Sequence, residues 1–294
     1  MMLSILSMAL TGLIFQEIKF SSAISRLSLS LPMAKAAVRR VFYDREADDT
    51  EDYDTMQELT KENSAILCDK NSYKYYYADK KPGVDPEEII DEGALININL
   101  ASLDVLKRLP GIDEDLAEGI MNSGLRPYAA INELLLVEDM TKEKFMLIKD
   151  MITVYGNGKV NINTASRGVL LCLGLDEELV DVIMDFRKVN KIEKKEDSEE
   201  TSEEEEEEEE DAIEAEEEED YGFSSLSSMI NSLRDFASLS LRQEQDLISL
   251  QNSLSVKSEY LRFNIIPQIN NKPGTHYSII IDPSKKKLLS WREY

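Results

Sequence analysis

Few side chains in this 294-residue chain could carry covalent or metal chemistry. His276 is the only histidine, so a Ser-His-Asp triad would have to use it. The two cysteines, Cys68 and Cys172, lack the paired spacing of a zinc site, are too few for a disulfide framework, and are interpreted as free buried thiols. Acidic residues are plentiful, but no fixed spacing pairs them for catalysis. The sequence therefore predicts a protein that is not an enzyme and has no assignable cofactor or metal ligand.

An internal repeat suggests a different possible function, the binding of a DNA backbone. Residues 96–120 (ININLASLDVLKRLPGIDEDLAEGI) align with residues 160–183 (VNINTASRGVLLCLGLDEELVDVI), and each copy is predicted to be a helix–hairpin–helix unit. Such units often hold DNA through backbone amides of a Gly-hydrophobic-Gly turn. Here Asp113 and Asp176 stand at the second glycine, where a carboxylate repels phosphate. The hairpins are interpreted as packing modules, and a membrane-tethered DNA-binding or uptake protein is the alternative.

Each copy of the repeat also contains residues suited to capping and turning its helices. Leu106 and Leu109, like Leu170 and Leu173, are predicted to face inward. The predicted helix caps are Asn99 and Asn163 for the first helix, and Asp113 and Asp176 for the second, with tight turns at Gly111 and Gly174.

The strong negative charge of the chain is confined to one segment. Residues 193–220 contain 20 acidic residues and two lysines, a net charge of −18 out of −25, whereas the remainder carries 31 basic and 38 acidic residues. We predict a disordered acidic insertion over residues 191–222. A mobile run of glutamates lacks the fixed oxygen geometry of a specific calcium site. The absence of any basic excess argues against electrostatic binding of nucleic acid.

The N-terminal segment is predicted to be one long helix that ends near residue 45. Residues 1–15 carry no charge and would span roughly 22 Å as a helix, less than the ~30 Å hydrocarbon core of a bilayer. Apolar residues then continue at spacings of mostly three or four as far as Phe42, and Pro32 is expected to bend the helix. This pattern favours a membrane-anchored stalk, with a signal peptide or a buried core helix as alternatives.

Strands are predicted on both sides of the helical region. The aromatic run at residues 73–78 (YKYYYA) precedes that region, and alternating patterns at 256–269, 276–281 and 287–291 follow it. The C-terminal segments form a predicted antiparallel meander that residues 73–78 can join. Further helices are predicted at 130–137, 142–152, 223–236 and 243–254.

Together these features resemble the type II secretion system protein K family (general secretion pathway protein K), the large minor pseudopilins. The similarity rests on the repeat, on VKSEYLRFNII at 256–266, on the terminal YSIIIDPSKKKLLSWREY, and on AKAAVRRVFYDREADDTEDYDTMQEL after the apolar run. It covers nearly all of the chain outside the acidic segment.

The resemblance implies an α+β, pilin-like fold, with a long N-terminal helix, a small antiparallel sheet and a large inserted helical domain that contains two helix–hairpin–helix (SAM-like) units. The implied divisions are a stalk helix at 1–45, a linker and first strand at 46–95, the helical domain at 96–254 and C-terminal strands at 255–294.

The resemblance further implies a role without catalysis at the tip of a periplasmic pseudopilus, in company with minor pseudopilins I and J, in support of protein export. The expected location is the inner membrane, spanned once, with the bulk of the chain in the periplasm. The resemblance also raises calcium binding in the helical domain, for which no ligand can be assigned here. No glycine precedes a hydrophobic run as a prepilin-peptidase site requires, so we expect the reading frame to extend upstream of Met1.

Overall fold

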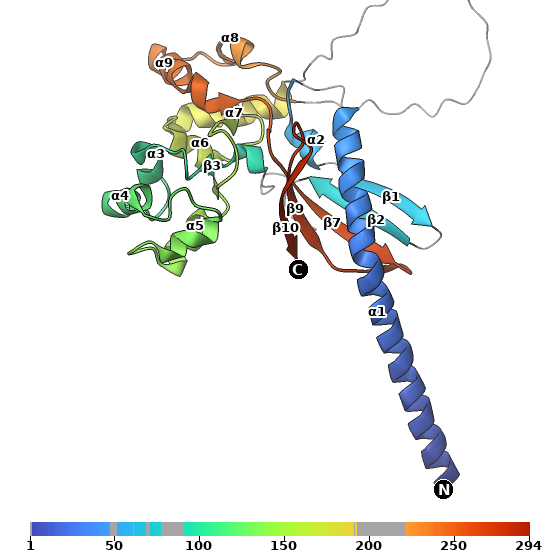
Figure 1. The fold of residues 1–294 in the computed structure, drawn as a ribbon. Helices are drawn as coiled ribbons and strands as arrows, with labels where there is room; N and C mark the ends of the chain where they lie inside the picture. The colour runs from blue at the N-terminus through green and yellow to red at the C-terminus, as the bar shows by residue number, and fades with distance from the viewer. Residues whose placement is uncertain are drawn as a thin grey trace, which may run out of the picture.

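The computed structural model describes residues 2–47, 52–60, 62–68, 71–77, 91–190, 192 and 221–294. Figure 1 shows a long N-terminal helix, an antiparallel sheet packed beside its C-terminal part, and a helical domain at one end of that sheet. The chain leaves the sheet after β2 (Asn71–Tyr77) and returns to it at β7 (Leu261–Ile269), so the helical domain is an insertion. The predicted α+β, pilin-like fold is confirmed.

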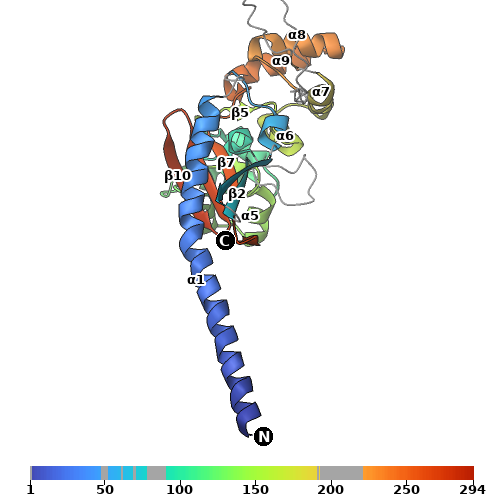
Figure 2. The same cartoon turned by 90° about the vertical axis from the view of Figure 1, so that its right-hand side faces the viewer.

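Helix α1 (Met2–Glu46) continues without interruption through Pro32, although proline removes one intrahelical hydrogen bond. Its N-terminal half projects away from the remainder of the molecule in both views (Figures 1 and 2). Contact with the sheet begins near Ser30, whose buried hydroxyl oxygen accepts a hydrogen bond from the Thr275 amide at 3.1 Å. The helix therefore has one half fixed to the sheet and one half that leaves it.

The sheet is antiparallel, with the strand order β1-β2-β7-β9-β10 and the short β8 paired with β7. The aromatic run pairs with β7 as predicted, whereas β1 was not foreseen from the sequence. Asn270 and Asn271 both have positive φ and form the two-residue turn between β7 and β8. The other strands are β1 (Glu62–Cys68), β8 (Lys272–Pro273), β9 (Tyr277–Asp282) and β10 (Lys287–Glu293).

A small hydrophobic core lies between α1 and one face of the sheet. Ala34, Ala37 and Val41 are fully buried there, and their small size lets the helix approach the strands closely. The strands supply alternate residues, as a sheet with one covered face requires. These are Tyr73 of β2, Leu261, Phe263 and Ile265 of β7, and Tyr277, Ile279 and Ile281 of β9.

The inserted domain contains the larger core and consists of two equivalent copies. Each copy begins and ends on a short parallel strand pair: β3 (Ile96–Asn97) with β4 (Ile152–Thr153), and β5 (Val160–Asn161) with β6 (Leu254–Ser255). The structural repeat is therefore larger than the two predicted segments. The first copy contains α3 (Leu103–Lys107), α4 (Glu114–Asn122), the 3₁₀ helix η3 (Ile131–Leu136) and α5 (Lys142–Ile148); the second contains α6 (Arg167–Leu173), α7 (Glu177–Val189), α8 (Leu226–Phe236), α9 (Leu241–Leu250) and η4 (Gln251–Ser253).

One helix-cap prediction is wrong. Ser102 and Ser166, rather than Asn99 and Asn163, cap α3 and α6 by accepting hydrogen bonds from the amides at their N3 positions. Each of the two asparagines instead binds a later segment of its own copy, and its side-chain amide both donates and accepts a hydrogen bond. Asn99 pairs with the backbone of Tyr128, and Asn163 pairs with the backbone of Phe223. Asparagine can do this because its side chain presents a donor and an acceptor, like a peptide unit.

The acidic segment leaves the second copy between α7 and α8. Residues 193–220 form most of the predicted disordered insertion at 191–222 and lie outside the described residues, so the structure describes this insertion only at its borders. Those borders are joined, because Asn190 and Gly222 exchange two hydrogen bonds, of 2.9 and 3.0 Å. Gly222 has a φ of +142°, and a Cβ there would lie 2.6 Å from Asn163 Oδ1, so glycine is required. Asn163 and Phe223 then hold the returning chain in the same way as Asn99 and Tyr128.

Candidate functional site

The projecting half of α1 exposes many large apolar side chains. Leu10 is 59% exposed, Phe20 68% and Leu27 66%, and many of their neighbours are similarly uncovered. A soluble monomer rarely exposes so many large apolar side chains together, so this surface indicates contact with a partner or a membrane. Its exposed large members are Met8, Leu10, Leu13, Ile14, Phe15, Ile18, Phe20, Ile24, Leu27, Leu29 and Leu31; we call this set the stalk surface.

The apolar stripe predicted on the helix is divided by the sheet. Val38 and Val41 are buried in the small core, whereas Leu27 and Leu31 of the same stripe are exposed. The boundary lies near Ser30, where the β8–β9 connection meets the helix. Within the residues that the structure describes, no helix combines the length and the hydropathy needed to cross a membrane.

The first hairpin turn contacts α5 of its own copy, although Gly111 and Asp113 remain exposed. Gly111 adopts a φ of +75°, and a Cβ there would lie 3.3 Å from Leu147 of α5. Asp113 caps α4 by accepting a hydrogen bond from the Leu116 amide at 2.9 Å, and its other oxygen lies 3.5 Å from Lys144 Nζ. The hydrogen bond from the Leu116 amide lowers the pKa of Asp113, and the positive charge of Lys144 lowers it further by a smaller amount. The turn residues thus take part in contacts within the first copy.

The second hairpin turn makes comparable contacts with different residues, although Gly174 remains exposed. Gly174 adopts a φ of +106°, and a Cβ there would lie 2.8 Å from the guanidinium of Arg108, which comes from the first copy. Asp176 caps α7, and Gln243 of α9 donates to the same carboxylate at 3.5 Å. The first turn therefore packs within its own copy, whereas the second meets Arg108 of the other copy. This arrangement does not favour the DNA-binding alternative.

Cys172 and His276 show no reactive arrangement in the described structure. Cys172 is buried between the two copies, its Sγ lies 3.2 Å from the Arg108 carbonyl, and burial raises its pKa to about 11. This agrees with a free buried thiol. The Cys68 side chain lies outside the described residues. His276 contacts Asn264 through Nε2 at 3.1 Å and packs beside Tyr294, next to the C-terminal strand.

The described residues contain no group of three or more histidine, cysteine, aspartate or glutamate side chains placed to hold a metal ion. The most buried carboxylates are already engaged by protein donors, as described next. Calcium binding therefore stays a prediction without ligands.

Buried polar residues join the helical domain to the sheet and to α1. Asp54 forms an ion pair with Arg45 at the end of α1 and accepts a hydrogen bond from the Ser258 amide at 2.7 Å. Asp91 accepts hydrogen bonds from the hydroxyls of Ser258 and Thr164, the latter at 2.6 Å. Asp54, Asp91 and Ser258 are each at most 2% exposed. We call this group, with Thr164, the junction cluster.

A second set of contacts lies beside the junction cluster. Glu92, in the 3₁₀ helix η2 (Glu92–Ala94), accepts a hydrogen bond from the Thr153 hydroxyl of β4. Its other oxygen lies 2.5 Å from Arg262 of β7, which satisfies that buried atom electrostatically. A buried carboxylate needs such partners because an unpaired one would be strongly destabilising. Glu92 therefore ties the first copy of the helical domain to the central strand of the sheet.

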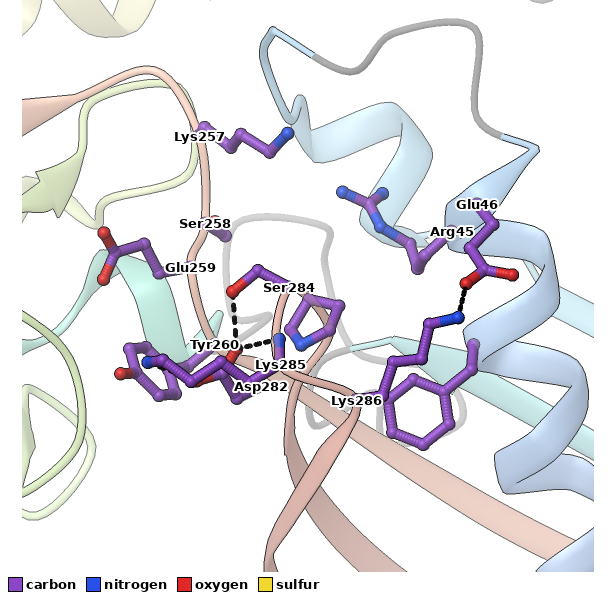
Figure 3. A pocket seen from close by; sticks show the side chains of 12 residues that line it. Arg45, Glu46, Lys257, Ser258, Glu259, Tyr260, Asp282, Ser284, Lys285 and Lys286 are labelled. Atoms are coloured by element: carbon purple, nitrogen blue, oxygen red, sulfur yellow. Dashed lines mark hydrogen bonds and ion pairs between the residues drawn. The ribbon is translucent and has the colours of Figure 1, made fainter.

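A cavity of about 460 Å³ lies between the end of α1, the chain that leaves the helical domain and the β9–β10 turn. Figure 3 shows Lys286 reaching Glu46 of α1, and Lys285 and Ser284 reaching Asp282. Burial raises the pKa of Asp282, but its hydrogen bonds outweigh this effect, so the pKa lies below its ordinary value. Three chain segments thus line the cavity, and the Lys286–Glu46 ion pair joins two of them, the β9–β10 turn and α1.

Taken together, the fold is that of a pilin-like protein that carries a helical insertion. A profile of the helix–hairpin–helix motif matches residues 91–153, the first copy together with the chain that leads into it. No curated protein matches the sequence. Among solved structures, the fold is similar to a chain in the crystal structure of the GspK-GspI-GspJ complex from the enterotoxigenic Escherichia coli type 2 secretion system. The TM-score is 0.55 at 12% sequence identity, and the similarity covers 96% of this chain and 99% of that chain.

Proposed function

We propose that this protein is a minor pseudopilin of a type II secretion system and takes the K-type position at the tip of the pseudopilus. The observation that carries the proposal is the fold similarity over nearly the whole length of both chains, which includes the stalk helix, the sheet and the insertion. The sequence resemblance of the repeat and of the C-terminal strands supports the same assignment. The proposed role is structural and does not involve catalysis.

The stalk surface supports assembly through α1. Its large apolar side chains have no covering element among the described residues, whereas the other half of the same helix is covered by the sheet. Apolar helices gain stability by burying such surface against one another, at roughly 25 cal/mol per Å². We propose that the stalk surface packs against the equivalent helices of I-type and J-type minor pseudopilins. GspI and GspJ are the other components of the complex that contains the similar chain.

We further propose that α1 holds the protein at the inner membrane before assembly, with the sheet and the helical domain in the periplasm. The uncharged run over residues 1–15 and the exposed apolar residues that follow it support this location. After assembly the same residues would lie among sister helices in the filament. The tip would then support export of folded proteins across the outer membrane.

Co-purification with tagged I-type and J-type subunits tests the proposed assembly. Leu27→Asp places a charge on the stalk surface at a residue that is 66% exposed, so the fold should survive while partner recovery falls at least ten-fold. Ser22→Asp is the matched control, because it adds the same charge at an exposed polar position of the same helix. If wild type recovers neither partner, or if Leu27→Asp recovers both as well as the control does, the proposed function is wrong.

A further inference from the structure

The segments that connect the two bodies of the protein meet at Ser258. The chain enters the helical domain through residues 91–94 and leaves it through residues 256–260. The entering and leaving segments are in contact, because a Cβ on Gly93 would lie only 2.6 Å from the Ser258 Cβ. The segment after α1 joins them, because the Asp54 amide donates to the Val256 carbonyl at 2.9 Å. Any rotation of the helical domain on the sheet must therefore disturb the contacts of Ser258.

Asp91 is the carboxylate of this junction that is held by neutral donors alone. Its Oδ2 accepts hydrogen bonds from the hydroxyls of Thr164 and Ser258, and its Oδ1 accepts one from the Gly93 amide at 3.0 Å. Among the described residues it forms no ion pair, although it is only 2% exposed. Burial raises the pKa of Asp91 to about 6, against the lowering effect of these three hydrogen bonds.

No positively charged side chain near Asp91 is paired with the negative charge of its carboxylate in the described structure. Asp54, in the segment after α1, adds repulsion, and its partner Arg45 is already engaged. Glu92, the next residue in the chain, is paired with Arg262 of β7. The leaving segment contributes Lys257 and Glu259, one of each sign, beside Ser258. The neighbouring elements contribute polar but uncharged groups: Thr153 of β4, Asn161 of β5 and Thr164 of the turn after β5.

We propose that Asp91 makes this junction sensitive to pH, so that its protonation tightens the attachment of the helical domain to the sheet and its deprotonation loosens it. The closed junction buries the carboxyl beside Asp54, whereas an open junction exposes it to water. The neutral form therefore prefers the closed state. This inference concerns the junction alone and stands whether or not the proposed function holds.

The direction and size of the effect follow from linkage. A carboxyl whose pKa is higher in the closed state stabilises that state fully below its ordinary pKa of 3.8, and the stabilisation is lost as the pH rises through about 6. Between pH 5 and pH 7 the opening equilibrium of the junction should increase about ten-fold, and it should change little above that range.

Hydrogen exchange of the junction amides in the full-length protein, corrected for the intrinsic dependence of exchange on pH, measures this opening. The amides of Asp54, Gly93 and Ser258 should lose about ten-fold protection between pH 5 and pH 7 in wild type. Asp91→Asn removes the titrating group and should abolish that dependence. Asp115→Asn changes an exposed carboxylate in α4 and should behave as wild type.

Ser258→Ala gives an independent check on the mechanism. Its hydroxyl lowers the pKa of Asp91, so its removal should shift the midpoint of the protection change to higher pH. A wild-type profile without pH dependence overturns the proposal even if no variant folds. Retention of the full dependence in Asp91→Asn, or an unmoved midpoint in Ser258→Ala, overturns it as well.

Discussion

Both halves of α1 carry apolar residues, yet the structure uses them in opposite ways. From Met8 to Leu31 the helix exposes large leucine, isoleucine and phenylalanine side chains. From Ala34 to Val41 it buries alanine and valine against β2 and β7. Small residues allow a helix to approach a sheet closely, whereas large exposed ones present area to a partner. The difference separates the half that stabilises the folded monomer from the half that is available for assembly.

The largest effect should follow from a charge in the buried half. Val41→Asp places a carboxylate where no water reaches, so we expect a loss of at least about 3 kcal/mol in the free energy of unfolding. Urea unfolding can be followed through the fluorescence of Trp291, the only tryptophan, whose ring lies 5.2 Å from Tyr277 of the same core.

Arg39→Asp is the control for that measurement, because Arg39 is exposed on the same part of the helix. Its free energy of unfolding should change by less than about 0.5 kcal/mol. Equal effects of the two substitutions would mean that α1 does not depend on the sheet contact.

A charge in the projecting half should leave the fold intact and weaken membrane retention. Leu10→Asp would place a carboxylate among hydrocarbon chains, at a cost of roughly 2.5–3.5 kcal/mol on insertion scales. Cell fractionation should find more of this variant in the soluble fraction than wild type. Val38→Asp should stay with the membrane while it disturbs the packing of the sheet. A fully soluble wild type, or equal retention of all three proteins, would contradict the proposed anchor.

The smallest effect is expected at the boundary between the halves. Ser30→Ala leaves the Thr275 amide without its acceptor and should reduce the free energy of unfolding by about 1–2 kcal/mol. Ser28→Ala removes an exposed hydroxyl that donates only to the Ser25 carbonyl of the same helix, and should change stability by less than about 0.5 kcal/mol. Thermal unfolding of the two variants locates the boundary, and a larger effect from Ser28→Ala would move it toward the N-terminus.

Local patterns predicted much of this architecture. The spacing of apolar residues indicated the long helix, and alternation indicated the C-terminal strands, since both depend on neighbours in the sequence. The same spacing could not distinguish Leu27 from Val38, because the periodicity of a helix shows which side chains share a face and not what covers that face.

The missed features depend on distant residues. Strand β1 has a mixed composition and is defined by its pairing with β2, so its sequence alone was not indicative. The parallel pairs that close the two copies join residues far apart in the chain, such as Val160 and Leu254. Asn99 and Asn163 were assigned to the nearest helix, whereas their partners lie 29 and 60 residues further on. The junction cluster was missed because its members come from separate segments.

Because Asn190 and Gly222 are hydrogen-bonded to each other, the segment between them is expected to tolerate changes in length and sequence. The chain departs and returns at one point, where Phe186 and Phe223 stack with ring centroids 4.5 Å apart. Closing a loop between fixed ends becomes only slowly more costly, by about 0.6 kcal/mol for each doubling of its length. We expect such a position to accept insertions and deletions while the hairpin core keeps its geometry. It is also the natural place to insert a fluorescent domain or an affinity tag into the molecule.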